Sequence, residues 1–195
     1  MAHDSEYDFA VAMLNGDIEN KLEVPIRDFI FEWTLSQFKN KPVKIFQVGA
    51  IETFRIAWRV GSGWADTIFG PYIEKYGGKL TIADINLDNL SHSIFAASSL
   101  GYKIEAKYGD AIDYLDNDTY DIYYLDGGND PQETLDQFNK IKDQKAIVII
   151  DDYSIKGTLI PTDLDITIYD VANQVGIIDM REYYEGIVYW TLQRK

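Results

Sequence analysis

The chain has 195 residues, a formal net charge of −14 and a pI near 4.4. A surface this negative repels DNA, RNA and anionic lipid, so we expect no nucleic-acid partner and no membrane partner. The absence of cysteine excludes disulfides, thiolate zinc sites and cysteine nucleophiles, and no run approaches 18 apolar residues. These totals predict one cytoplasmic domain over 1–195 with a single well-filled core.

The first 40 residues are expected to form a helical cap on a core that spans 43–195. Apolar residues recur at near-helical spacing over 6–39, in two pieces broken near Asn15–Asp17.

Short apolar runs then alternate with segments of helical character. The first such run, VKIFQVGA at 43–50, reads as a buried strand. Four more runs are expected to be strands, and they lie at 79–86, 102–111, 120–128 and 146–153. Helices are predicted between them, after the glycine turn at 61–63, over 87–100 before Gly101, and from Pro131 to 143.

This alternation predicts an α/β fold, namely a Rossmann-like, doubly wound, mostly parallel sheet with helices on both faces. After a helix near 163–175, GIIDMREYY and GIVYWTLQRK surround Glu185-Gly186 and resemble an antiparallel hairpin. The hairpin would bring the sheet to seven strands. Its aromatic edge leaves a homodimer open as an alternative to a monomer.

Carboxylates follow the predicted strands at their C-terminal ends. They are Asp84, Asp110, Asp126 and the pair Asp151–Asp152. Ligands of open parallel sheets bind at these ends, near the point where the strand order reverses. At any one position a helix cap or a turn explains an aspartate equally well, but four strand ends together favour a binding site.

Glycines at the first strand and before the first core helix indicate a close approach of ligand to backbone. Gly49 ends the strand, Gly61-Ser62-Gly63 precedes the helix, and Asp84 follows Gly63 by 21 residues, near the spacing of a ribose-binding acid. The segment IETFRIAWRV at 51–60 separates the two glycine elements. A dinucleotide fingerprint keeps them together, so a nucleoside without a pyrophosphate is favoured over NAD.

The chain resembles the class I S-adenosylmethionine-dependent methyltransferases in the order and spacing of its motifs, and among them it is most similar to the small-molecule O-methyltransferases. The motifs that carry the resemblance are IFQVGA with GSGW, TIADIN, YGDA, YDIYYLDGG and IVIIDDY. The resemblance covers 43–153 and implies methyl transfer from S-adenosylmethionine to an oxygen of a small molecule. It implies that the cofactor contacts Gly49, Gly61, Ser62, Gly63, Asp84, Ile85, Asp110, Ala111 and Asp126. Asp84 would bind the ribose hydroxyls, and Asp110 with Ala111 would lie beside the adenine.

A divalent metal is the open part of this prediction. If the fourth and fifth strands are neighbours, Asp126, Asp151 and Asp152 converge, and their oxygens suit Mg²⁺ or another hard cation. In the metal-dependent members that this chain resembles, such an ion binds the acceptor hydroxyl, which implies catalytic roles for Asp126 and Asp152. The alternative is that these aspartates only bind backbone and cap turns, as in metal-free members.

The chain departs from the family at two places, because Gln47 stands where an acid is usual and 51–60 interrupts the glycine loop. That segment either folds over the site as a lid, with Phe54, Arg55, Trp58 and Arg59, or packs on the N-terminal helices. No base is identified; Lys156 is a candidate by its position, but a solvated surface lysine is the favoured interpretation. Two further functions stay open, a nucleoside-binding module without catalysis and an NAD-dependent oxidoreductase.

Overall fold

A computed structural model describes residues 31, 32, 34–54, 64–128, 130–151, 156–160 and the backbone of 176–179. The elements in chain order are β1 (Val43–Val48), α3 (Asp66–Tyr76), β2 (Gly78–Asp84), α4 (Leu87–Leu100), β3 (Glu105–Tyr108), η2 (Ala111–Asp113), β4 (Ile122–Leu125), α5 (Pro131–Ile141), β5 (Ile147–Ile150) and β6 (Gly176–Asp179). Strands and helices therefore alternate as the sequence predicts. Within the described part of the chain, no helix is both long and apolar enough to cross a membrane.

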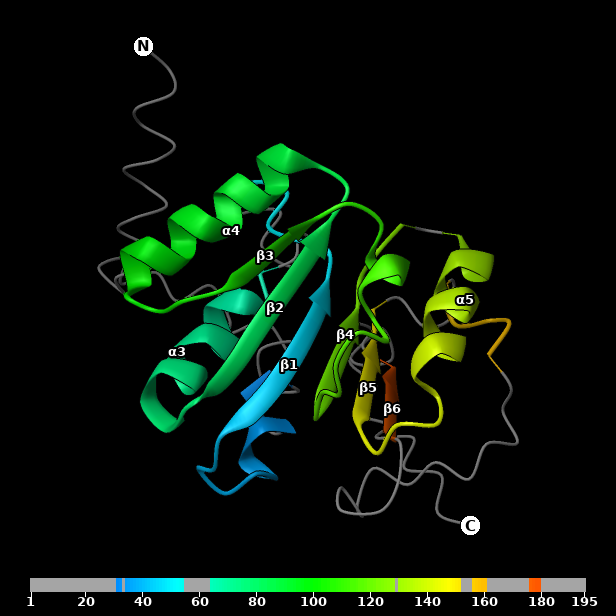
Figure 1. Ribbon diagram of the computed structural model, residues 1–195, viewed down its shortest axis with the longest axis horizontal. Helices are drawn as coiled ribbons and strands as arrows, with labels where there is room; N and C mark the ends of the chain where they lie inside the picture. The colour runs from blue at the N-terminus through cyan, green and yellow to red at the C-terminus, as the bar shows by residue number, and fades with distance from the viewer. Residues whose placement is uncertain are drawn as a thin grey trace, which may run out of the picture.

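The strands form one sheet in the order β3-β2-β1-β4-β5-β6, and every neighbouring pair is parallel (Figure 1). The order reverses between β1 and β4, which places a ligand-binding crevice at their carboxyl ends. The strands β4 and β5 are neighbours, which is the condition on which the metal hypothesis depends, and Leu125 lies opposite Ile150. The next residues, Asp126 and Asp151, therefore lie at the same edge.

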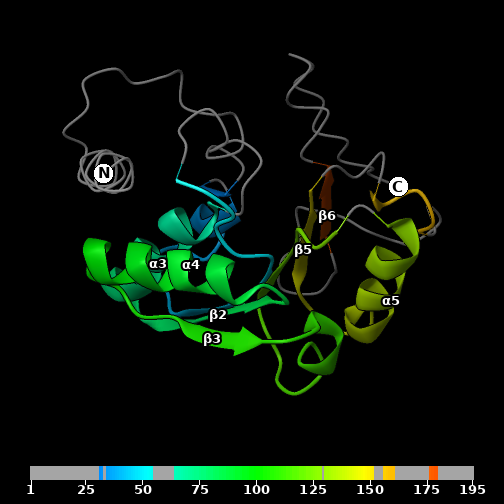
Figure 2. The ribbon, with the colours of Figure 1, turned by 90° about the horizontal axis from the view of Figure 1, so that it is seen from above.

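The central strands β1, β2, β4 and β5 are largely buried on both faces, because their side chains alternate between two apolar layers, whereas the edge strand β3 is half-buried to exposed. On the face covered by α3 and α4, Ile45 and Tyr124 pack with Phe69 of α3 and Leu90 of α4. On the opposite face, the neighbouring strand residues pack with Phe138 of α5. Figure 2 shows α3 and α4 on one side of the twisted sheet and α5 on the other. The doubly wound prediction is confirmed.

Local signals fix where the helices begin and end. Asn86 caps α4 by accepting a hydrogen bond from the Asp88 backbone, and Gly101 ends it in the left-handed conformation with φ of 79°. Asp130 caps α5 in the same way, with Pro131 in the first turn. These ends agree with the predicted ones to within two residues.

Two predicted elements differ from what the structure shows. The third strand is shorter than predicted, because the ring of Tyr102 packs against Gly70 of α3, where any Cβ would clash with it. At the other end of the sheet, β6 pairs directly with β5 in parallel, so the sheet has six strands among the described residues.

Other predicted elements fall wholly or partly outside the described residues. The helix near 163–175 and the second strand of the terminal hairpin lie there, so the seventh strand and the hairpin stay predictions. Of the predicted N-terminal helices, 31, 32 and 34–36 are helical, and Phe31 and Leu35 pack into the α3 side of the core.

Candidate functional site

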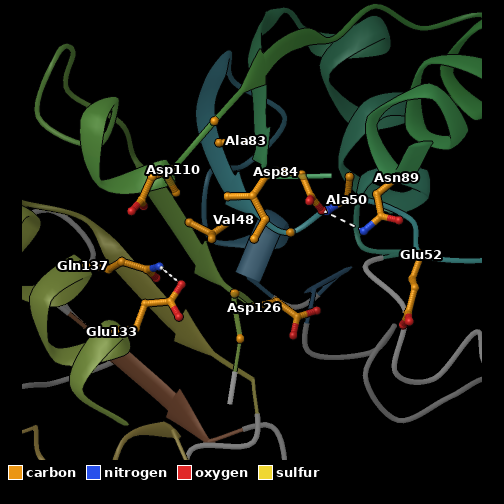
Figure 3. A pocket seen from close by; sticks show the side chains of 16 residues that line it. Val48, Ala50, Glu52, Ala83, Asp84, Asn89, Asp110, Asp126, Glu133 and Gln137 are labelled. Carbon is orange, nitrogen blue, oxygen red and sulfur yellow. Dashed lines mark hydrogen bonds between the residues drawn. The ribbon is translucent and has the colours of Figure 1, made fainter. Parts of the chain in front are cut away.

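A cavity of about 210 Å³ opens at the carboxyl ends of β1, β2, β3 and β4. Its walls come from the segments that follow these four strands and from α5, and Figure 3 shows carboxylates on several sides of it. Pockets for small ligands commonly measure about 300–1,000 Å³. A ligand of nucleoside size therefore fills this cavity and extends beyond it.

The structure brings all six of the described candidate cofactor residues to this cavity. The lining includes Gly49, Asp84, Ile85, Asp110, Ala111 and Asp126. Gly61, Ser62 and Gly63 lie outside the described residues, so their predicted contact with the cofactor stays a prediction. Asp151 does not line the cavity but lies next to Asp126 on the neighbouring strand.

Asp84 ties the loop after β1 to the end of β2. Its Oδ2 accepts hydrogen bonds from the Ala50 backbone N–H at 2.8 Å and the Asn89 amide at 3.2 Å (Figure 3). Its Oδ1 accepts one from the Asn86 backbone N–H at 2.7 Å. An ionised carboxylate offers about four acceptor positions. Three are used within the chain, so one position on Oδ1 remains for a ligand hydroxyl.

Gly49 is required at its position by the geometry of the strand end. Its φ is +87°, and a Cβ there would lie 2.5 Å from the carbonyl oxygen of Asp126. The loop after β1 therefore runs against the end of β4, at the reversal of strand order. Gln47 is fully buried, and its side-chain amide donates to the Gly49 carbonyl at 2.7 Å.

Two further lining residues come from the segments that follow β3 and β2. Asp110, after β3, is polar, and Ile85, after β2, is apolar. Asp110 caps η2 by accepting a hydrogen bond from the Ile112 backbone at 3.0 Å, so the alternative role as a helix cap is present here. Asp110 also lines the cavity. Ile85 is 74% exposed beside Asp84, which leaves an apolar side chain available to the face of a planar ring.

Sequence reasoning missed four polar residues of the lining, Glu52, Asn89, Glu133 and Gln137. Burial, with Asp110 and Asp130 nearby, raises the pKa of Glu133, while Lys156 lowers it. A signal for Glu133 exists in the sequence, because Asp130 and Glu133 have the spacing of a capping box at a helix that starts beside the strand ends. Glu52 has no comparable signal.

Lys156 forms a buried ion-pair cluster with the two aspartates that follow β4 and β5. Its ammonium lies 2.9 Å from Asp126 Oδ1 and 3.8 Å from Asp151 Oδ2, and the three side chains are 6–8% exposed. The hydroxyl of Tyr124 donates to the other oxygen of Asp126 at 2.9 Å. The prediction of a solvated Lys156 is therefore wrong, because its amine pairs with carboxylates inside the protein.

The predicted metal site finds no support in the described residues. No group of three or more His, Asp or Glu side chains among them is arranged to hold a metal ion. A divalent ion about 4 Å from the Lys156 ammonium would be repelled by about 8 kcal/mol at an effective dielectric constant near 20. Asp126 and Asp151 therefore do not fit a divalent ion while Lys156 lies between them; Asp152 is outside the described residues.

The described start of the segment 51–60 both borders the cavity, through Glu52, and packs on α4, through Phe54. Phe54 is 7% exposed and meets the rings of Trp64, Phe95 and His92 at 5.0–5.7 Å. Trp64 is buried in the same cluster, and its indole N–H donates to the Thr53 carbonyl at 3.1 Å. Arg55, Trp58 and Arg59 lie outside the described residues, so their role as a lid stays a prediction.

No protein-family model matches the chain, and no curated protein matches it in sequence. Solved structures with a similar chain trace include a putative sarcosine dimethylglycine methyltransferase from Galdieria sulphuraria, at 19% identity and a TM-score of 0.39 over 57% of this chain and 41% of that one. The PH0226 protein from Pyrococcus horikoshii is 23% identical, with a TM-score of 0.42 over 63% and 53% of the two chains.

An NAD-dependent alcohol dehydrogenase is 12% identical, with a TM-score of 0.48 over 84% of this chain and 47% of that one. The chain thus spans about half the length of the structures that it resembles. At this level of similarity the residues of the site, rather than the neighbours, have to decide the function.

Proposed function

We propose that the chain binds S-adenosylmethionine in this cavity and transfers its methyl group to an oxygen of a small molecule. The observation that supports the proposal best is the charge of the lining. Among the described lining residues, five are acids, namely Glu52, Asp84, Asp110, Asp126 and Glu133, and none is a lysine or arginine. Such a wall attracts the positively charged sulfonium of the cofactor.

The same charge argues against a dinucleotide. NAD carries a pyrophosphate, which open α/β sheets bind with a glycine-rich turn at a helix N-terminus. Here Glu52 lies on the loop after β1, where that turn would run, and Asp84 uses an oxygen to hold the loop. The strand order alone is compatible with either S-adenosylmethionine or NAD. The negative charge of the loop after β1 is what favours S-adenosylmethionine.

The described residues would bind and orient the two substrates. S-adenosylmethionine supplies an electrophilic methyl group on a positively charged sulfur. Asp84 has one free acceptor position for a ribose hydroxyl, and Ile85 offers an apolar surface for the base. Asp126, at the reversal of strand order, is held by Tyr124 and Lys156 and keeps its orientation. Alignment of an acceptor oxygen with the methyl group accounts for much of the barrier in such transfers.

The choice of an oxygen acceptor rests on the resemblance of 120–128 and 146–153 to small-molecule O-methyltransferases. The acidic net charge supports a neutral or cationic small molecule over a nucleic acid.

Calorimetry tests the proposal directly. S-adenosylmethionine, its demethylated product and NAD⁺ are titrated into the protein, each with and without Mg²⁺. We expect S-adenosylmethionine to bind at least about ten-fold more tightly than NAD⁺, a difference of about 1.4 kcal/mol. Tighter binding of NAD⁺ would refute the assignment and favour an oxidoreductase.

A second candidate is a nucleoside-binding module without catalysis. It is favoured by Asp126, since both of its oxygens already accept hydrogen bonds within the protein. The two candidates differ in turnover. A binding module would hold S-adenosylmethionine and release no demethylated product with a broad panel of hydroxyl acceptors, whereas the enzyme would release it with at least one.

A further inference from the structure

Glu52 differs from the other described acids of the cavity lining in the use that the chain makes of its carboxylate. Each of the other four accepts at least one hydrogen bond from the protein, and they are Asp84, Asp110, Asp126 and Glu133. In the part of the chain that the structure describes, the exposed carboxylate of Glu52 takes part in no hydrogen bond and no ion pair. Its negative charge is therefore available to a ligand.

The backbone just before Glu52 is held by two side chains of α4. The N–H of Ile51 donates to the Ser93 hydroxyl at 3.0 Å, and its carbonyl oxygen lies 3.0 Å from His92 Nδ1. A carbonyl oxygen only accepts, so His92 meets it as the N–H donor. The side chain of Ile51 is fully buried as well. One helix thus satisfies both backbone groups of the residue that precedes Glu52.

The backbone just after Glu52 is anchored in the same way. The indole of Trp64 donates to the Thr53 carbonyl at 3.1 Å, and the ring of Phe54 packs edge-on against the rings of Trp64 and Phe95. Glu52 is therefore an exposed, charged side chain on a backbone that is fixed on both sides. A ligand that binds it does not have to order the loop first, which lowers the entropic cost of binding.

Glu52 lies at the end of the cavity where the tail of a bound nucleoside would emerge. Figure 3 shows it across the cavity from Asp110 and Glu133, with Asp84 between them. In the proposed complex the ribose lies at Asp84 and the base lies toward Ile85 and Asp110. The base and the 5′ substituent leave the ribose on opposite sides, so the 5′ substituent points toward Glu52.

The 5′ substituent of S-adenosylmethionine is an amino-acid tail with an ammonium and a carboxylate at its end. An ammonium combines a positive charge with N–H donors, whereas the sulfonium has a charge and no donor, so the ammonium is the better partner for an unpaired carboxylate. Glu52 repels the carboxylate of the tail by the same charge. These two effects together set the orientation of the tail.

We propose that Glu52 binds the ammonium of the amino-acid tail of S-adenosylmethionine and so orients the tail along the loop after β1. The inference rests on the proposed function, because it concerns the same cavity and the same cofactor. It separates recognition of the tail from recognition of the sulfonium. S-adenosylmethionine and its demethylated product carry the same tail, so Glu52 contributes equally to the binding of both.

Three ligands test this assignment by calorimetry on the full chain. They are S-adenosylmethionine, the demethylated product S-adenosylhomocysteine, and 5′-methylthioadenosine, which keeps the nucleoside and the sulfur but has no amino-acid tail. Glu52→Gln removes the charge and keeps the size of the side chain. Asp88→Asn is the matched control, because it removes one negative charge from an exposed acid of α4 that does not line the cavity.

We expect Glu52→Gln to weaken the binding of both tail-bearing ligands about two- to five-fold and to leave the binding of 5′-methylthioadenosine unchanged. Asp88→Asn should leave all three affinities unchanged. The urea midpoint of Glu52→Gln should equal that of the wild type, since the carboxylate has no partner among the described residues.

Three results would overturn the assignment while the wild type binds these ligands. They are unchanged affinities in Glu52→Gln, a loss confined to S-adenosylmethionine, which would point to the sulfonium instead, and an equal loss for all three ligands, which would indicate a structural role. A wild-type chain that binds none of the three ligands would overturn the proposed function and this inference together. The failure of the inference alone is thus distinguishable from the failure of the proposed function.

Discussion

Asp66 is the first residue of α3, and its side-chain carboxyl group is fully buried. Neither of its oxygens meets hydrogen-bond geometry with any described group. Burial raises its pKa from the ordinary 3.8 to about 7, and the Ser93 hydroxyl and Thr67 backbone N–H lie near enough to lower it only in part. A helix N-terminus favours a negative charge by about 0.3–1 kcal/mol, which is too little to offset the loss of water.

The raised pKa makes stability depend on pH with a definite sign. Between pH 3.8 and about 7 the folded chain holds this proton and the unfolded chain has lost it. The free energy of unfolding therefore falls as pH rises through this range and levels off above it. Between pH 5 and pH 8 the two pKa values correspond to a loss of about 2.5 kcal/mol from this group.

Replacement of Asp66 by Asn removes the titration and keeps the size of the side chain. Urea denaturation at pH 5 and pH 8 should show that Asp66→Asn gains about 2.5 kcal/mol relative to wild type as pH rises. The control is Asp88→Asn, which changes an exposed acid in the first turn of α4. If the free energy of unfolding of the wild type differs from that of Asp66→Asn by the same amount at both pH values, the argument from burial is refuted.

Three further substitutions test other parts of the structure. Gly49→Ala should lower the free energy of unfolding by about 2 kcal/mol or more in urea, since it combines a left-handed φ with a clash against Asp126; an unchanged midpoint would contradict that geometry. Tyr102→Phe should raise thermal stability by an amount equivalent to about 1 kcal/mol, because the buried hydroxyl has no partner among the described residues; a loss would reveal a hydrogen bond there. Glu133→Gln should weaken S-adenosylmethionine binding about two- to five-fold in calorimetry and leave binding of the demethylated product, which lacks the sulfonium charge, nearly unaffected; an equal loss for both ligands would rule out an effect of that charge.

The sequence predicted the framework well because its signals are local. Short apolar runs and a cap or glycine at each helix end suffice to place β1, β2, α4 and β5. Their alternation then implies a parallel sheet, which in turn brings Asp84, Asp110 and Asp126 to one edge. Tyr102 shows the limit of the method, since its apolar character extends the predicted third strand while its ring actually packs on α3.

The chemistry of the edge was less predictable because it depends on contacts between distant segments. Lys156 looks solvated in sequence, and only the turn that buries Ile160 brings its amine to Asp126, 30 residues away. Phe54 and Trp64 illustrate the same point, since their aromatic rings are equally suited to a ligand or to a core, and the packing of α4 decides for the core.

The most direct test of the central claim is a crystal structure of the chain with S-adenosylmethionine and Mn²⁺. The claim is that aspartates at the ends of parallel strands hold a positively charged nucleoside in the cavity of Figure 3. We predict the nucleoside over Gly49, with a ribose hydroxyl at hydrogen-bond distance from Asp84 Oδ1. A nucleoside bound away from these strand ends, with the cavity left to solvent, would contradict it.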